Sequence, residues 1–106
     1  MRSKDEHDEV ENALSDLGFK DTDELSAKAV LAVKLNGLID KRSLSQTEVA
    51  SITGMTQPKV SQIRRYKLQN ISLERLMQAL VSLDQQVEIV VRPARRTAPA
   101  CISVVA

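Results

Sequence analysis

Side chains able to hydrogen-bond a nucleic acid are concentrated in one short stretch of the sequence, between residues 46 and 67. Gln57 and Gln62 carry amides that can form paired hydrogen bonds with adenine, and the ammonium group of Lys59 can reach the acceptors of guanine. Arginine and lysine side chains follow directly, and such cations attract phosphates. The chemistry that this stretch predicts is non-covalent recognition of a polyanion.

Constellations typical of catalysis or metal binding are missing from the sequence. His7, the single histidine, lies in an acidic arm without a nucleophile or a second imidazole to pair with it. The three glycines, at positions 18, 37 and 54, are isolated and cannot form a phosphate-binding loop. Cys101, the single cysteine, has no partner for an intramolecular disulfide. We therefore expect a protein that is not an enzyme and that uses no metal or cofactor.

Charge is unevenly distributed along the chain, although its formal net charge is only +1. Residues 1–24 contain nine acidic and three basic side chains, a net −6, whereas residues 25–106 contain five acidic and twelve basic ones, a net +7. A basic domain behind an acidic arm is typical of a protein that binds a polyanion. The alternative is a basic surface that is merely solvated. Phe19 and Tyr66 are the only aromatic residues, which disfavours stacking on single-stranded RNA.

Length and hydropathy predict one cytoplasmic domain with an aliphatic, helical core. A chain of 106 residues, 42% of them hydrophobic, is long enough to bury such a core without disulfides or metals. No apolar run approaches the roughly 18 residues needed to span a membrane. The charged amino terminus does not resemble a signal peptide.

Apolar residues at helical spacing predict an all-α fold of about five helices. A short helix is expected around residues 10–17, and a long one over residues 22–41. The long helix carries an apolar stripe formed by Leu31, Leu35, Leu38 and Ile39. Three shorter helices are expected over residues 46–53, 57–65 and 72–83.

The two helices over 46–53 and 57–65 have the spacing of a helix-turn-helix. Ser45 and Glu48 form a capping box that starts the first of them, and Gly54 can take the positive φ that the turn requires. Thr56 is placed to cap the second helix, with Pro58 in its first turn. The spacing alone also fits a plain αα-hairpin, but the caps and the glycine together favour the helix-turn-helix.

These residues resemble the Cro and lambda-repressor family, also known as the xenobiotic-response-element (XRE) class of regulators. The residues that carry the resemblance are Gln46, Ala50, Gly54, Val60 and Ile63. More narrowly, the segments LSQTEVASITGMTQPKVSQIRR, ISLERLMQAL and VEIVVRPA resemble a subgroup of small antitoxin-like regulators found beside genes for ribosome-dependent ribonuclease toxins. The resemblance covers roughly residues 14–94 and implies a lambda-repressor-like bundle of helices.

The resemblance also implies that the helix over 57–65 enters the major groove of double-stranded DNA. Base contacts are then expected from Thr56, Gln57, Lys59 and Gln62. Phosphate contacts are expected from Gln46, Ser61, Arg64, Arg65 and Lys67. For any one of these side chains, the alternative is a solvated polar residue.

Two positions depart from the family pattern, which often has glycine after the recognition helix and after the helix that follows it. Tyr66 and Asp84 occupy these positions. Aspartate tolerates a left-handed backbone, but tyrosine does so poorly. The turn around Tyr66 is therefore expected to differ from that of the family.

A change of period near the carboxyl end predicts one β-strand over residues 85–93. Val87, Ile89 and Val91 alternate with other residues before Pro93 ends the pattern. A lone strand needs a partner, either from the tail or from a second subunit, and we favour pairing across a two-fold axis. Such a homodimer would read a palindromic operator, with its two recognition helices one turn of DNA apart. The alternative is a strand buried inside one chain.

Together these features predict a sequence-specific DNA-binding regulator that represses its own operon. The resemblance further implies an antitoxin whose acidic arm complements a basic ribonuclease-type toxin. The alternative is a protein-interaction module that neutralises a toxin without significant specific DNA binding. The expected organisation is an acidic arm with a short helix (1–21), a helix-turn-helix domain (22–84), a dimerisation strand (85–93) and a flexible basic and apolar tail (94–106).

Overall fold

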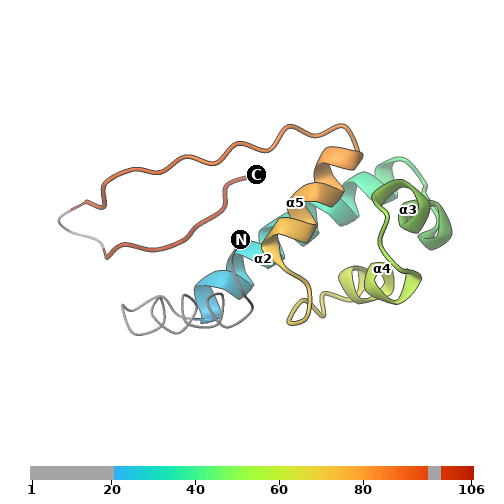
Figure 1. The fold of residues 1–106 in the computed structure, drawn as a ribbon, viewed down its shortest axis with the longest axis horizontal. Coiled ribbons are helices and arrows are strands. Elements are labelled where there is room, and N and C mark those ends of the chain that lie inside the picture. The colour runs from blue at the N-terminus through green and yellow to red at the C-terminus, as the bar shows by residue number, and fades with distance from the viewer. Residues whose placement is uncertain (1–20, 96–98) are drawn as a thin grey trace, which may run out of the picture.

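The computed structural model describes residues 21–95 and 99–106. These residues form four α-helices and no strand (Figure 1). The helices are α2 (Asp21–Lys41), α3 (Gln46–Thr53), α4 (Gln57–Arg64) and α5 (Leu73–Ser82). Each lies within one residue of its predicted bounds, while the fifth helix, expected around residues 10–17, falls outside the described residues. Of the four helices, none is long and apolar enough to cross a membrane.

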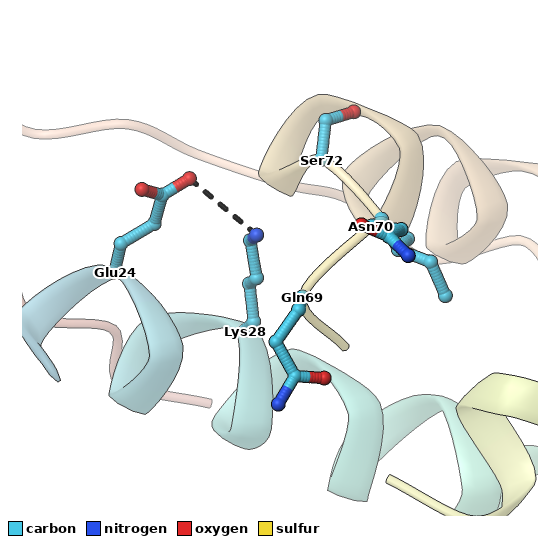
Figure 2. A pocket seen from close by; sticks show the side chains of 6 residues that line it. Glu24, Lys28, Gln69, Asn70 and Ser72 are labelled. Carbon is cyan, nitrogen blue, oxygen red and sulfur yellow. Dashed lines mark ion pairs between the residues drawn. The ribbon is translucent and has the colours of Figure 1, made fainter. Parts of the chain in front are cut away.

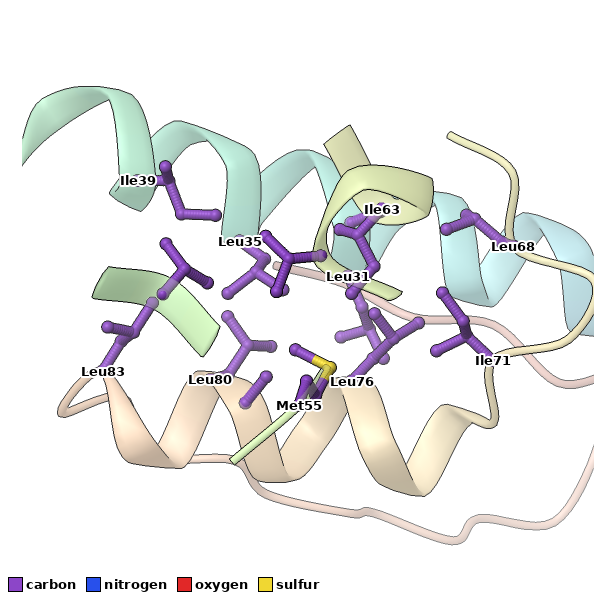
Figure 3. Packing of buried hydrophobic residues seen from close by; sticks show 14 residues of the cluster. Leu31, Leu35, Ile39, Met55, Ile63, Leu68, Ile71, Leu76, Leu80 and Leu83 are labelled. Atoms are coloured by element: carbon purple, nitrogen blue, oxygen red, sulfur yellow. The ribbon is translucent and has the colours of Figure 1, made fainter. Parts of the chain in front are cut away.

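The hydrophobic core lies between α2 and α5, with α3 and α4 closing one end (Figures 1 and 3). Leu31, Leu35 and Ile39 point from α2 into this core, as their spacing predicts, and Leu38 is half-buried beside it. Burying one such side chain completely stabilises the fold by about 1.5–3 kcal/mol. Because α4 and the loop after it also contribute to the cluster, the core fixes the position of α4 relative to α2.

Three of the helices end in left-handed residues that are not glycine. Ser43, Tyr66 and Asp84 have φ angles of 52°, 58° and 66°. After α4, the N–H of Tyr66 donates to the carbonyl oxygen of Ile63 over 3.0 Å, and the N–H of Lys67 donates to that of Gln62 over 2.9 Å. These paired hydrogen bonds define a Schellman motif, and the same pattern follows α2 and α5.

The expectation that the turn around Tyr66 differs from the family's is therefore wrong. Tyr66 takes the left-handed conformation that a glycine would take at this position. The two hydrogen bonds satisfy carbonyl groups that the helix leaves unpaired, and Leu68 is buried directly after the turn. In this conformation a residue with a Cβ atom bears a steric cost of about 1–2 kcal/mol.

The predicted β-strand over 85–93 does not form in the single chain. Residues 85–95 run extended along one side of the bundle, and residues 99–106 return towards α2 (Figure 1). Val87 packs against the core, whereas the side chains of Ile89 and Val91 are 75% and 91% exposed. A strand is defined by its hydrogen-bonded partner, and the described part of this chain provides none for the segment.

Candidate nucleic-acid interface

A turn over residues 54–56 joins α3 to α4 and sets the angle between them. Gly54 has the left-handed φ of 75°, and its N–H donates to the carbonyl oxygen of Ala50 over 2.9 Å. The side chain of Met55 is buried in the core, which holds the turn against the bundle. The Thr56 hydroxyl accepts a hydrogen bond from the N–H of Lys59 over 3.4 Å. Thr56 is therefore the predicted N-cap of α4, and its side chain is engaged at the helix end.

The predicted capping box at the start of α3 is confirmed. The N–H of Ser45 donates to Oε1 of Glu48 over 3.0 Å, and the N–H of Glu48 donates to the Ser45 hydroxyl oxygen over 3.1 Å. The first of these bonds, with a smaller contribution from the Ser45 side chain, lowers the pKa of Glu48. Gln46 is exposed at this helix end, where main-chain N–H groups and the helix dipole favour an anion.

The inner face of α4 anchors the helix, which leaves a polar face outside. Val60 and Ile63 are both buried, as predicted for the anchoring residues of a helix-turn-helix. Ala50 packs beside this cluster from α3, where a small side chain allows the two helices to approach closely. Because Val60 and Ile63 point into the core, the opposite face of α4 is turned away from the bundle.

The expected base-reading side chains lie on the outer face and the first turn of α4. Gln57 is exposed, whereas Lys59 and Gln62 are half-buried along the helix. Nε2 of Gln57 donates a hydrogen bond to the hydroxyl oxygen of Thr47, 3.4 Å away on α3. Thr47 therefore holds the Gln57 amide against α3, a role that periodicity could not reveal because the contact crosses the turn.

Arg64 differs from the other predicted phosphate contacts because α2 already binds its guanidinium group. Nη1 donates to the side-chain oxygen of Asn36 over 3.1 Å, and Nη2 pairs with a carboxylate oxygen of Asp40 over 2.6 Å. Arg64 therefore fastens the end of α4 to α2, and its contact with a phosphate stays a prediction. Arg65 and Lys67 lie exposed on the surface, while Ser61 is half-buried, with its carbonyl oxygen accepting from Nε of Arg65 over 3.4 Å.

A family model described as a helix-turn-helix domain matches residues 13–92 of the chain. A solved structure named as an XRE family transcriptional regulator is 51% identical to it and superposes with a TM-score of 0.75. The match covers 82% of this chain and 99% of that one. The chain belongs to the XRE family of helix-turn-helix proteins. None of the curated proteins matches it.

In this XRE-family protein, α5 also reaches the turn of the helix-turn-helix. Nη2 of Arg75 donates a hydrogen bond to the carbonyl oxygen of Gly54, 3.2 Å away. That carbonyl belongs to the end of α3, where a positive charge is also favourable for the helix dipole. The sequence carries no local signal for this contact, because the two residues are 21 positions apart.

In this XRE-family protein, Lys28 of α2 holds the loop before α5. An open pocket of about 220 Å³ lies between α2 and the loop before α5 and is lined by Glu24, Lys28, Gln69, Asn70, Ile71 and Ser72 (Figure 2). The buried ammonium group of Lys28 pairs with Glu24 at 3.5 Å and donates to the carbonyl oxygen of Leu68 over 3.3 Å. Lys28 thus finds its partners within the protein. Among the described residues, no group of histidine, cysteine and acidic side chains could hold a metal ion.

Proposed function

We propose that the protein is a sequence-specific DNA-binding transcriptional regulator. The observation that carries this proposal is the construction of α4: its apolar side is anchored by Val60 and Ile63, so its polar side faces outward. A helix held in this way can enter the major groove with its first turns towards the base edges. Membership in the XRE family and the name of the solved relative support the same function.

Sequence recognition in this proposal comes from the first turns of α4. The amides of Gln57 and Gln62 can each form paired hydrogen bonds with adenine, and Lys59 can reach guanine. The contact between Gln57 and Thr47 restricts the exposed amide before DNA binds, which lowers the entropy cost of ordering it. Thr56, the N-cap of α4, directly precedes Gln57 and would face the same base edges.

Phosphate contacts in this proposal flank both ends of the helix-turn-helix. Gln46 is exposed at the start of α3, and the charges of Arg65 and Lys67 are exposed at the other end, after α4. Ser61 can bind a phosphate only where the DNA backbone comes close to α4, because its side chain is short and half-buried. Arg64 can join them only by leaving Asp40, since that pair occupies its guanidinium group.

The titration that tests this function uses fluorescence anisotropy. A labelled duplex from the region upstream of the protein's own gene is compared with a scrambled duplex at two salt concentrations. The proposal requires tight binding to the first duplex that persists in the presence of the second. Equal, steeply salt-dependent binding to both duplexes would contradict sequence recognition, and the absence of binding would favour the protein-interaction module.

Variants of α4 separate base reading from general DNA affinity. The double variant Gln57→Ala, Gln62→Ala should lose at least about tenfold in affinity for the operator, because each paired base contact contributes about 1–3 kcal/mol of discrimination. Its affinity for scrambled DNA should change little. Gln78→Ala is the matched control, since Gln78 is an exposed glutamine on α5, outside the helix-turn-helix.

We further propose that the protein acts as a homodimer on a palindromic operator. The segment over 85–93 supports this, because its extended main chain and the exposed side chains of Ile89 and Val91 are suited to pairing with a second copy. Replacing both residues with glutamate should convert a dimer into a monomer in sedimentation experiments. Val105→Glu is the control, as Val105 is also almost fully exposed but lies outside the segment. A monomeric wild-type protein would contradict the proposal.

Repression of its own operon follows in this proposal from steric exclusion of polymerase. A transcriptional reporter fused to the upstream region should fall in activity when the protein is supplied and recover with the Gln57→Ala, Gln62→Ala variant.

The antitoxin role stays a prediction, because the acidic arm expected to bind a toxin lies outside the described residues. Toxicity of a neighbouring ribonuclease gene, relieved by co-expression of this chain, would support that role.

A further inference from the structure

Tyr66 combines a strained backbone with an exposed aromatic side chain. It is the single tyrosine of the chain, and its φ of 58° lies in the left-handed region that bulky residues avoid. Its side chain remains 50% exposed and is not part of the core cluster. Packing therefore does little to offset the strain, and a glycine would be more stable at the same position. A strained residue that packing does not explain is a candidate for function.

The position of Tyr66 relates it directly to the recognition helix. It lies just beyond the last turn of α4, between the exposed cations Arg65 and Lys67. The Schellman hydrogen bonds of Tyr66 and Lys67 fix the main chain here. The position from which the tyrosine side chain leaves the main chain is therefore determined by the fold.

We propose that Tyr66 binds the DNA backbone beside the recognition helix, with its hydroxyl donating a hydrogen bond to a phosphate oxygen. This rests on the proposed DNA-binding function. The first turns of such a helix face the bases, so a residue beyond its last turn is closer to the sugar-phosphate backbone. Tyrosine is among the residues that bind phosphates, and the two flanking cations make the same surface attractive to them.

The Tyr66→Phe variant isolates the hydroxyl group, because it keeps both the aromatic ring and the backbone strain. Its affinity should fall by about twofold to tenfold, equally for the operator and for scrambled DNA, since a phosphate contact carries no sequence information. The loss should be the same at both salt concentrations, because a neutral hydroxyl releases no counterion. Lys67→Ala provides the contrast: it should lower the slope of affinity against salt by about one.

The Tyr66→Gly variant separates stability from binding. It should raise Tm by about 4–8 °C through relief of strain, while weakening DNA binding at least as much as Tyr66→Phe does. Asp84→Gly is the matched control, since Asp84 has the same Schellman geometry at the end of α5. It should also raise Tm, by a smaller amount because the exposed ion pair between Asp84 and Arg42 is lost. It should leave DNA affinity unchanged.

Three results would overturn this inference. If the wild-type protein binds its operator and both Tyr66 variants bind equally well, Tyr66 is no DNA contact, although the proposed function stands. If the variants keep their DNA affinity but self-associate more weakly in sedimentation, the tyrosine serves a protein contact. If the wild-type protein binds no DNA, the proposed function fails and the role of Tyr66 fails with it.

Discussion

The side chain of Asn36 on α2 donates a hydrogen bond from Nδ2 to the main-chain carbonyl oxygen of Ile63 on α4, 3.0 Å away. The same oxygen accepts the N–H of Tyr66, so Asn36 ties the left-handed turn after α4 to the central helix. Its own oxygen accepts a hydrogen bond from Arg64. Because Asn36 and Ile63 are both buried, the hydrogen bond between them holds the carboxyl end of the recognition helix from inside the protein.

Replacing Asn36 with alanine should lower the free energy of unfolding by about 1–2 kcal/mol, through lost hydrogen bonds and a small cavity. Urea denaturation measures the loss. Asp40→Asn is the control, because Asp40 and Arg64 form a more exposed pair whose removal should cost less than about 1 kcal/mol. Equal losses in the two variants would mean that the buried asparagine has no special role.

Alanine should have opposite effects at two glycines of this protein. A Cβ atom at Gly54 would have no neighbour within 4 Å, so the left-handed φ of 75° is the only cost, and Gly54→Ala should destabilise by about 1 kcal/mol. A Cβ atom at Gly37 is equally free of contacts, but Gly37 lies within α2. Gly37→Ala should therefore stabilise by up to about 1 kcal/mol. Thermal unfolding would refute this if both variants shifted Tm in the same direction.

The capping box of α3 should contribute less to stability in acid. The Ser45 N–H and, less strongly, its side chain lower the pKa of Glu48 below its ordinary value of 4.5. A lowered native pKa means that the stabilisation is complete above the unfolded pKa and is lost as pH falls through the native one. Glu48→Gln retains an acceptor for the box but does not titrate. The stability advantage of wild type over this variant should shrink on acidification below about pH 4.5, and parallel pH profiles of Tm would contradict it.

Arg75 should support DNA binding although it lies on α5. Arg75→Ala removes the hydrogen bond to the carbonyl oxygen of Gly54, which should lower the free energy of unfolding by about 1 kcal/mol. Operator affinity should fall by about fivefold, the equivalent of a similar energy, because the turn sets the angle of α4. Arg92→Ala removes an equal charge from the exposed carboxyl-terminal segment and serves as the control. If both variants lose the same affinity for the operator, Arg75 acts through charge alone. If Arg75→Ala keeps the affinity of the wild type, Arg75 does not support DNA binding.

Much of the helix-turn-helix could be predicted because its signals are local. The capping box of Ser45 and Glu48, the left-handed Gly54 and the N-cap Thr56 each act within four residues along the chain. Helix bounds followed from these caps and from the spacing of apolar side chains. The anchors Val60 and Ile63 were predictable for the same reason, since helical periodicity assigns them to the inner face of α4.

The sequence by itself thus determined the helices, the turn and which polar residues form the outer face of α4, because helix caps and periodicity depend on neighbouring residues. Only the tertiary structure decided that Arg64 binds α2, that Arg75 supports the turn and that Thr47 holds Gln57. These contacts join residues 10 to 28 positions apart, and packing of the helices brings them together. The tertiary structure also supports the left-handed backbone of Tyr66, because Asn36 of α2 donates to the same Ile63 carbonyl oxygen that accepts the Tyr66 N–H.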